Sequence, residues 1–322
     1  MDVICVASWN ADLVSRVPRP VARGETLLAS AFEISPGGKG SNAAVAAARQ
    51  GATVGVVARV GQDDFGRMAL ALWRAEGIDT THVEQAEAER SGVAQIWVYE
   101  DGGDRGGQSG GHSGDHSGDN SIAVYPGAGA GLGPRHVQAA RESLLACRVV
   151  MAPCEVPLAA TAEAFRIARE GDALTLLNPA PARPLPDELL ASVDVLTPNE
   201  TELRVLAGMA ADAPLQAAAQ ALLARGAKAV LVTLGAAGCT LYRHGLAPHR
   251  LAGRRMAVVD TIGAGDTFTG ALAAALARAE TLTDAMGWAN AAAALSVTGR
   301  GAIAGMPSRA QVSQLMAQYG GS

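Results

Sequence analysis

The sequence has 322 residues, with 26 Lys and Arg against 31 Asp and Glu, so its formal charge is −5. A nucleic-acid-binding surface normally shows a basic excess, and this balance argues against a nucleic-acid partner. Hydrophobic residues make up 49% and charged residues 18% of the chain, which is a globular and not a disordered composition. The length allows one or two domains, and we expect a single α/β domain over residues 1–322.

The N-terminus and the Ala-rich segments bear on targeting. Residues 1–9 contain no basic region followed by a long apolar stretch, so no secretory signal is visible. The Ala-rich run 271–277 meets Arg278 and Glu280 long before the roughly 20 apolar residues that a membrane span needs. We therefore expect a cytoplasmic protein with no membrane partner. The four cysteines lack metal-ligand spacing and are expected to be reduced core residues.

Short apolar runs alternate with helix-period segments along most of the chain. Buried strands are expected at residues 3–7, 53–60, 149–151, 174–178, 193–197 and 229–233. Helices are expected at residues 40–50, 65–76, 157–170, 200–207, 214–225 and 264–279. This alternation is typical of a doubly wound α/β fold, in which a mostly parallel sheet carries helices on both faces.

Several segments instead alternate like antiparallel strands with one exposed face. We expect them to form a small sheet beside the main one, with strands at about residues 12–16, 26–35, 91–100 and 121–126. Residues 101–120 hold Gly, Ser, Asp and His with nothing apolar to bury, which predicts a disordered loop. His112 and His116 suggest a metal site there, but a Gly-rich coil does not hold ligands in place, and a solvated loop is the preferred interpretation.

Residues 258–268 (VVDTIGAGDTF) are the most informative segment of the chain. They place small residues and a carboxylate at the start of a long helix, where unpaired N–H groups lie at the positive end of the helix dipole. Gly263, Ala264 and Gly265 would let the backbone approach a phosphate closely. Asp266 could accept a proton from an attacking hydroxyl, or could simply be an acid favoured by the dipole; the segment alone leaves both open.

A second glycine cluster, residues 37–42 (GGKGSN), precedes another expected helix. It would let backbone groups and Asn42 reach a polar ligand, although a plain turn is also open. The P-loop spacing is absent, and the Rossmann fingerprint is absent after the first strand. Ser8, Asn10 and Asp12 follow that first strand, at the sheet edge where open α/β proteins bind ligands.

Three further motifs lie in order between the two glycine clusters: NPAPAR at 178–183, LPDELL at 185–190 and TPNETE at 197–202. With residues 37–42 and 260–266 they make five ordered matches. On these motifs the sequence resembles the ribokinase branch of the PfkB family of carbohydrate kinases over almost its whole length. The resemblance implies a ribokinase-like α/β fold with a small β-sheet lid.

The resemblance also implies an activity: ATP-dependent phosphorylation of D-ribose at its 5-hydroxyl. Asp266 would be the general base, and backbone N–H groups of Gly263, Ala264, Gly265 and Asp266 would form an anion hole. The sugar would be bound by Asn10, Ala11, Asp12, Gly38, Lys39, Gly40, Ser41, Asn42, Glu155 and Asp266. The nucleotide would be bound by Asn199, Thr233, Leu234, Gly235, Ala236, Ala237, Gly238, Gly265, Asp266 and Asn290.

Two cations are implied as well. Mg²⁺ would be organised indirectly by Asn199 and Glu202, whose three-residue spacing is equally that of a helix capping box. A K⁺ loop would use Asp260, Ile262, Ser296, Gly299, Gly301 and Gly305, largely through backbone carbonyls. The family usually has longer residues at the positions of Gly299 and Gly305, so a hydroxyl ligand at Gly305 would be lost here.

The remaining expectations concern charge, the lid and substrate choice. Lys39 is expected to contact the sugar mainly through its backbone, and an ordinary pKa near 4 would be enough for Asp266 to act as the base. The lid would exclude water and form a homodimer contact, which the long run 101–120 could alter. Alternatives are a kinase of the same family for another sugar or a nucleoside, deoxyribose among them, and a non-catalytic sugar sensor.

Overall fold

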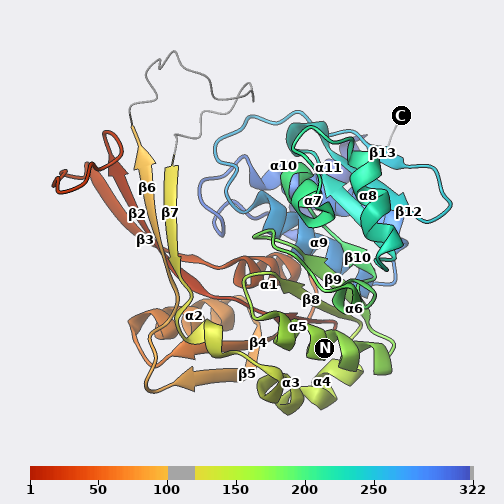
Figure 1. The fold of residues 1–322 in the computed structure, drawn as a ribbon, viewed down its shortest axis with the longest axis horizontal. Coiled ribbons are helices and arrows are strands. Elements are labelled where there is room, and N and C mark those ends of the chain that lie inside the picture. The colour runs from red at the N-terminus through yellow and green to blue at the C-terminus, as the bar shows by residue number, and fades with distance from the viewer. Residues whose placement is uncertain (101–119, 320–322) are drawn as a thin grey trace.

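The computed structural model describes residues 1–100 and 120–319. Of the expected loop 101–120, only Asn120 falls within these residues. Within the described part of the chain, a nine-stranded sheet and a four-stranded sheet account for the strands (Figure 1). The predicted α/β class with a smaller second sheet is confirmed.

The nine-stranded sheet runs in the order β13-β12-β11-β10-β9-β8-β1-β4-β5. Its strands are β1 (Val3–Val6), β4 (Val54–Gly61), β5 (Asp79–Ala86), β8 (Val149–Pro153), β9 (Leu174–Asn178), β10 (Val195–Leu196), β11 (Ala229–Thr233), β12 (Cys239–Arg243) and β13 (His249–Leu251). All neighbours from β11 to β5 are parallel, whereas β12 and β13 add to one edge in antiparallel fashion.

Two hydrophobic clusters cover the two faces of this sheet. Alternate residues of β1 belong to different clusters, Val3 and Cys5 to one and Ile4 and Val6 to the other. The first cluster packs under α1 (Lys39–Arg49), α2 (Asp64–Ala75), α9 (Ala264–Ala277), α10 (Leu282–Ser296) and α11 (Arg309–Tyr319). The second packs under α3 (Pro134–Ala139), α4 (Arg141–Ala146), α5 (Leu158–Glu170), α6 (Asp187–Leu190), α7 (Glu200–Ala207) and α8 (Leu215–Ala224). This period-2 alternation is what a strand buried on both faces requires.

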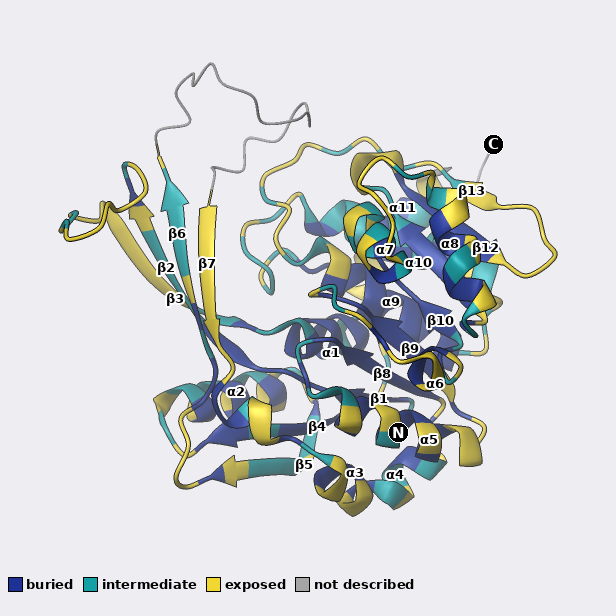
Figure 2. Ribbon diagram, viewed as in Figure 1, coloured by how far each residue is buried: buried dark blue, intermediate teal, exposed yellow. Residues whose placement is uncertain are grey.

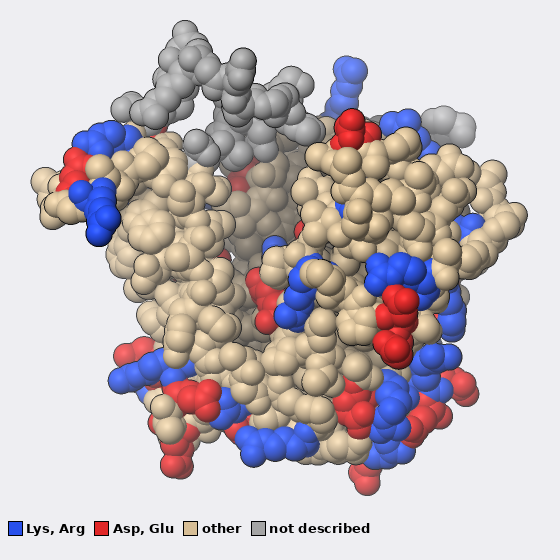
Figure 3. Space-filling model, viewed as in Figure 1, with Lys and Arg blue, Asp and Glu red and all other residues tan. Residues whose placement is uncertain are grey.

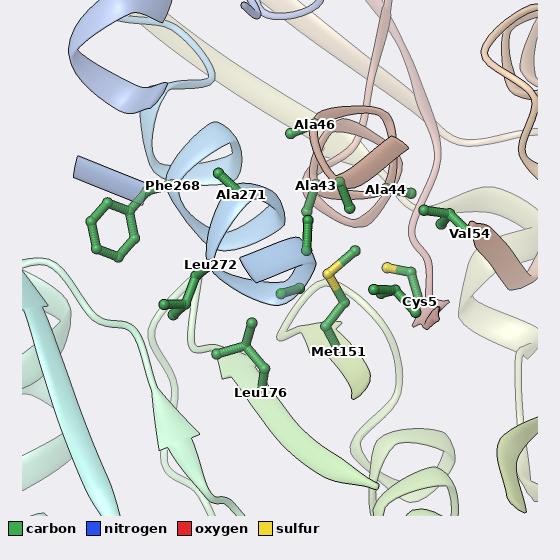
Figure 4. Packing of buried hydrophobic residues seen from close by; sticks show 14 of the residues in the cluster. Cys5, Ala43, Ala44, Ala46, Val54, Met151, Leu176, Phe268, Ala271 and Leu272 are labelled. Carbon is green, nitrogen blue, oxygen red and sulfur yellow. The ribbon is translucent and has the colours of Figure 1, made fainter. Parts of the chain in front are cut away.

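Helices α1 and α9 lie against each other on the sheet, and small residues make this possible. A Cβ at Gly270 would overlap the carbonyl oxygen of Ala43, so only glycine fits this crossing. Figure 4 shows Ala43 and Ala44 of α1 above Cys5 and Met151, with Ala271 and Leu272 of α9 to their left. The close crossing brings the N-terminal turns of the two helices together, which is where the candidate site lies.

The four-stranded sheet has the order β3-β2-β6-β7 and is called the lid sheet below. Its strands are β2 (Asn10–Val17), β3 (Ala31–Gly37), β6 (Val93–Tyr99) and β7 (Asn120–Tyr125). Figures 1 and 2 show it standing away from the main body, with β7 exposed along its length. The strand expected at 26–35 begins only at Ala31.

The pairs β2–β3 and β6–β7 of the lid sheet are antiparallel, as the alternation of these segments predicted, whereas its central pair, β2 and β6, is parallel. Between β3 and β6 the chain passes through α1, β4, α2 and β5 of the main body. A return of this length lets β6 start at the same end of the sheet as β2, which a short hairpin cannot do. In the described ranges, no helix is both long and apolar enough to cross a bilayer.

Candidate active site

The candidate site lies where the direction of the strand order reverses. From β1 the chain leads outward to β4 and β5 on one side, and from β8 onward it builds the other side. Ligands of open α/β sheets bind beyond the carboxyl ends of the strands at such a point. Ser8 follows β1 and Glu155 follows β8, and their side chains meet there at 2.6 Å. Figure 3 shows this face hollowed between the lid sheet and the main body, with charged side chains inside the hollow.

Asp266 lies in the first turn of α9 and is 6% exposed. Its Oδ2 accepts a 2.9 Å hydrogen bond from Asn42 Nδ2, and its Oδ1 accepts a 3.4 Å bond from Asn178 Nδ2. Burial raises the pKa of Asp266 to about 6, although nearby Lys39 and the bond from Asn42 act in the opposite direction. An ordinary pKa would be enough for the base, and burial raises the pKa above that value. At pH 7.5 the group is still mostly ionised and able to accept a proton.

The backbone before Asp266 is shaped for an anion. Gly263 caps α9 with φ 78°, a left-handed conformation, and a Cβ there would lie 2.9 Å from Ala302. Gly265 faces open space, with no atom within 4 Å of the position a Cβ would take. Ala264 donates a long 3.3 Å bond to the carbonyl of Thr261, while Gly265 and Asp266 lie in the turn whose N–H groups have no partner within a helix. A phosphate would therefore find N–H donors and room at this helix end.

Glu155 is fixed by the glycine cluster at the start of α1. Its Oε2 accepts bonds from Ser8 Oγ at 2.6 Å and from the backbone N–H of Lys39 at 2.8 Å. Ser8 Oγ accepts in turn from the N–H of Gly40 at 3.0 Å. A Cβ on Gly40 would lie 2.6 Å from the nitrogen of Ser8, so glycine is required for this approach. The arrangement leaves Oε1 of Glu155 for a ligand.

Asn10 and Asp12 share one face of β2, as their spacing predicts, and Asn10 is buried. The carboxylate of Asp12 occupies the place that a Cβ on Gly37 would take. Burial, and after it the charge of Glu155, raises the pKa of Asp12 to about 7. Ala11 differs from its neighbours: its side chain is buried, and its N–H donates to the carbonyl of Gly92 at 2.9 Å. At the start of β2, Asn10 and Asp12 are the residues whose polar side chains lie on the face toward the site.

Within the glycine cluster, the residues face different directions. The Ser41 hydroxyl is buried and accepts a 2.9 Å bond from the Trp73 indole, so this side chain faces the core. Gly38 has φ 91°, and a Cβ there would lie 2.8 Å from the Ser8 carbonyl oxygen. Asn42 Oδ1 is buried and, among the described residues, has no hydrogen-bond partner. A buried acceptor of this kind normally finds a donor, and a ligand hydroxyl can supply it.

The Lys39 ammonium lies among the acidic groups of the site. The nearby Asp266 carboxylate, and less strongly Glu155, Glu202 and Asp12, raise the pKa of Lys39. The backbone N–H of Lys39 donates to Glu155, and the ammonium offsets the negative charge around Asp266. The expected contact between this backbone and the sugar stays a prediction. Asn178 also contacts Asp266. The sequence placed this residue only inside the motif 178–183 and gave it no role at the site.

Asn199 and Glu202 form the capping box that their spacing allowed. Asn199 Oδ1 accepts from the N–H of Glu202 at 2.8 Å, and Glu202 Oε2 accepts from the N–H of Asn199 at 2.9 Å. Each side chain can still accept a hydrogen bond. Glu202 Oε1 is not part of the capping box, and Asn199 Oδ1 has a second lone pair. Asn199 also pairs with Thr233 through a parallel bridge, so the start of α7 adjoins the loop 233–238.

Loop 233–238 and Asn290, both expected on the nucleotide side, each contact residues 251–253, and Asn290 lines a pocket together with these residues. A turn at Gly235–Ala237 follows β11, and Gly238 closes it through a 2.8 Å bond between its carbonyl and the N–H of Leu234. This loop packs closely on residues 251–253. A Cβ on Gly253 would overlap the carbonyl oxygen of Ala236, so the close approach requires glycine at position 253. Asn290 Nδ2 donates to the carbonyl of Ala252 at 3.0 Å. A pocket of about 500 Å³ opens here and is lined by Leu251, Ala252, Gly253, Arg254, Arg255, Gly287, Asn290 and Met316.

The residues expected to bind K⁺ come from two segments that lie together. Asp260 Oδ1 accepts from the N–H of Ile262 at 3.0 Å, and Oδ2 accepts from the N–H of Gly301 at 2.8 Å. A Cβ on Gly305 would lie 2.7 Å from the carbonyl oxygen of Ser296 and 3.1 Å from that of Gly301. Carbonyl oxygens grouped in this way suit a monovalent cation, so the donor set fits K⁺. In the part of the chain that the structure describes, no cluster of three His, Cys, Asp or Glu residues offers a metal site.

Known proteins resemble this chain over nearly its whole length. The model of the pfkB family carbohydrate kinases matches residues 1–106 and 111–309. The chain is 35% identical to a ribokinase of Haemophilus influenzae over 313 residues, 97% of each protein. It is 34% identical over 319 residues to a deoxyribokinase of Salmonella typhi, covering 98% of this chain and 99% of the relative. The structure of Arabidopsis thaliana ribokinase with ribose and ATP superposes with a TM-score of 0.88 at 30% identity, covering 98% of both chains. The chain belongs to the PfkB family of carbohydrate kinases.

Proposed function

We propose that this protein transfers the γ-phosphoryl group of ATP to the 5-hydroxyl of D-ribose, giving D-ribose 5-phosphate and ADP. The observation that carries the proposal is the buried Asp266 carboxylate, held by Asn42 and Asn178 beside the first-turn N–H groups of α9. A base next to an anion site is what transfer of a phosphoryl group to an alcohol requires. The ribokinase relative and the ribose and ATP complex of the Arabidopsis protein support the choice of ribose.

In the proposed reaction, the chain mainly positions its substrates. Asn10, Asp12 and Oε1 of Glu155 bind sugar hydroxyls, and the unpartnered Asn42 Oδ1 accepts one more. Asp266 orients the attacking hydroxyl and takes its proton as the bond to phosphorus forms. The N–H groups of Gly265 and Asp266 stabilise charge on the transferred group, and removal of one such donor costs roughly 3 kcal/mol in other enzymes.

The nucleotide occupies the other half of the hollow. Loop 233–238 binds its phosphates and ribose, and the pocket beside Asn290 takes the base. Asn199 and Glu202 bind water molecules of the Mg²⁺ that accompanies ATP, using the oxygens left over from the capping box. When bound, Mg²⁺ neutralises phosphate charge. The carbonyls around Gly305 hold K⁺ next to the anion site. We also propose a cytoplasmic location, where ATP is available.

The lid sheet covers the sugar and contacts a second copy of the chain in this proposal. Its outer strands expose large apolar side chains, with Phe32 at 61%, Ile34 at 47%, Ile122 at 56% and Val124 at 54%. The strand register puts Phe32 and Ile34 on one face of the lid sheet and Ile122 and Val124 on the other. The lid sheet thus exposes apolar side chains on both faces, and such surfaces favour a protein partner. A homodimer would cover this surface with one kind of contact, because a two-fold axis buries the same surface on both copies. Light scattering after size exclusion tests it: a monomer mass at micromolar concentration would contradict the homodimer.

Deoxyribose is the second candidate substrate, because the deoxyribokinase relative is about as similar as the ribokinase. A non-catalytic sugar sensor is less well supported, because a sensor needs neither Asp266 nor the open backbone at Gly265. Coupled release of ADP with each sugar decides between the three. Faster turnover of deoxyribose than of ribose would replace the proposed substrate, and binding of ribose without turnover would favour the sensor.

A further inference from the structure

Side chains at the C-terminal end of α1 form hydrogen bonds to backbone carbonyls of the glycine-rich segment 299–307. Arg49 Nη1 donates to the carbonyls of Ile303 at 2.6 Å and Met306 at 3.0 Å. The rest of its guanidinium pairs with Glu76, at 3.0 Å from Nε and 2.6 Å from Nη2. Nη1 alone binds both carbonyls, while the two bonds to Glu76 fix the plane of the guanidinium and so the direction of Nη1. The flexible ammonium of a lysine has no such fixed plane.

Gln50 adds a third contact from the same end of the helix. This residue is 1% exposed, and its Nε2 donates to the carbonyl of Pro307 at 2.7 Å. Gln50 is fixed in turn by Trp288, whose indole N–H donates to Oε1 at 3.0 Å. The carbonyls of Ile303, Met306 and Pro307 are therefore bound by side chains at the C-terminal end of α1. The first turn of the same helix carries Lys39 and Gly40 of the candidate active site.

A restraint is needed because the segment is intrinsically loose. Gly299, Gly301 and Gly305 fall within seven residues, Gly301 has φ 79°, and glycine loses more conformational entropy on ordering than any other residue. A carbonyl cation site binds well only if its oxygens are already directed inward. Since Arg49 holds the Ile303 and Met306 carbonyls toward the end of α1, the intervening peptide planes, including that of Gly305, are limited to a narrow set of directions.

We infer that Arg49 is a positioning residue for the monovalent-cation loop: it touches neither substrate nor cation but sets the orientation of the carbonyls that bind K⁺. The inference rests on the proposed K⁺ site. Loss of an outer partner of a metal site typically lowers metal affinity by about 10- to 100-fold. Arg49→Met should therefore raise the K⁺ concentration needed for half of the effect by about tenfold or more, while the KM for ribose changes little.

The chain offers a matched control in Arg225. Its side chain has the same kind of partners, a carboxylate (Asp187, 2.8 Å) and two carbonyls (Leu206, 3.0 Å, and Leu185, 2.7 Å), but these belong to the opposite face of the sheet. Arg225→Met should lower the melting temperature comparably and leave the response to K⁺ unchanged. Arg49→Lys keeps the positive charge but not the planar guanidinium, and should fall between wild type and Arg49→Met.

The experiment is thermal unfolding of the full chain over a KCl series, with choline chloride holding the ionic strength constant, alongside turnover over the same series. We expect a rise in melting temperature with K⁺ whose midpoint shifts in Arg49→Met and not in Arg225→Met. An unchanged midpoint in Arg49→Met overturns the inference and leaves the cation site standing. A wild type that turns ribose over but responds to K⁺ in neither measurement overturns the cation site and the inference together, without touching the kinase assignment. If Arg49→Met does not fold, Arg49→Lys carries the same comparison.

Discussion

Asn42 of α1 donates a 2.9 Å hydrogen bond to Asp266 of α9, joining the first turns of two helices that lie 224 residues apart in the sequence. The amide thus holds the carboxylate with its nitrogen and presents its oxygen, which is buried and lacks a partner among the described residues. One side chain can therefore bind the substrate and orient the base. The contact exists because glycine at position 270 lets α1 and α9 cross closely.

Asp266→Asn tests the general base. Asparagine keeps the size of the side chain and can still bond to Asn178, but it cannot accept a proton. We expect kcat to fall by about 10²- to 10⁴-fold, with ribose binding retained. Coupled ADP release measures the first quantity and calorimetric titration with ribose the second. Unchanged turnover would remove Asp266 as the base.

The pH dependence of kcat/KM for ribose reports the free enzyme. Because burial raises the pKa of Asp266 to about 6, and only the ionised form accepts a proton, activity should fall as the pH drops through about 6. An ordinary aspartate would keep its activity about two pH units lower. Burial raises the pKa of Asp12 to about 7, so its titration overlaps the same pH range, and the profile should also be recorded for Asp12→Asn. An acidic limb near pH 4 in both proteins would contradict the buried carboxylate.

Ser8→Ala tests the fixation of Glu155. The substitution removes one of the two donors to Oε2 and the acceptor for the Gly40 N–H. The KM for ribose should rise by about tenfold, the scale of one hydrogen bond to a charged group, while the KM for ATP stays the same. Ser41→Ala is the control, because that hydroxyl bonds to Trp73 in the core. It should lower stability without moving the KM for ribose, and an equal rise in both variants would mean a general loss of structure.

Asp12→Asn tests the electrostatic cost of the sugar-binding site. The raised pKa of Asp12 means that the folded chain binds a proton more tightly than the unfolded chain between about pH 4 and 7. The free energy of unfolding of the wild type should therefore decrease as the pH rises through this range. Asparagine does not ionise, so the variant should be more stable than wild type at pH 8 and similar at pH 4.

Urea unfolding at both pH values gives the comparison. Glu33→Gln, an exposed carboxylate on β3 of the same sheet, is the control and should change neither value by much. A destabilised Asp12→Asn at pH 8 would mean that the carboxylate makes favourable contacts that outweigh its burial.

The regular part of the fold was predictable because its pattern is local. The strands Leu174–Asn178 and Ala229–Thr233 and the helix Glu200–Ala207 were predicted to the residue. Strand β5 was missed because Asp79–Ala86 contains polar residues and only one buried position, as an edge strand allows. Helix α10 (Leu282–Ser296) was missed because its Ala-rich sequence is apolar on most sides and shows little helical periodicity. The parallel pairing of β2 with β6 depends on the route of the chain and has no local signal.

The residue types of the site could be predicted from the sequence, whereas the directions and contacts of several of its side chains could not. Glycine clusters and helix starts indicated where ligands bind, and Asn42 lies in contact with Asp266. That Ser41 turns to the core, that Glu155 is held by Ser8, and that Asp266 is buried enough to shift its pKa all depend on distant segments. The alternate polar positions after β1 were the one available signal for Ser8.

The most direct test of the account is coupled ADP release with ATP and Mg²⁺ over a panel of pentoses, hexoses and nucleosides, each with and without K⁺. The account predicts that D-ribose gives the highest kcat/KM and that K⁺ raises it. Turnover of another sugar in preference to ribose would contradict the assigned substrate, and no turnover with any member of the panel would contradict the catalytic role of Asp266.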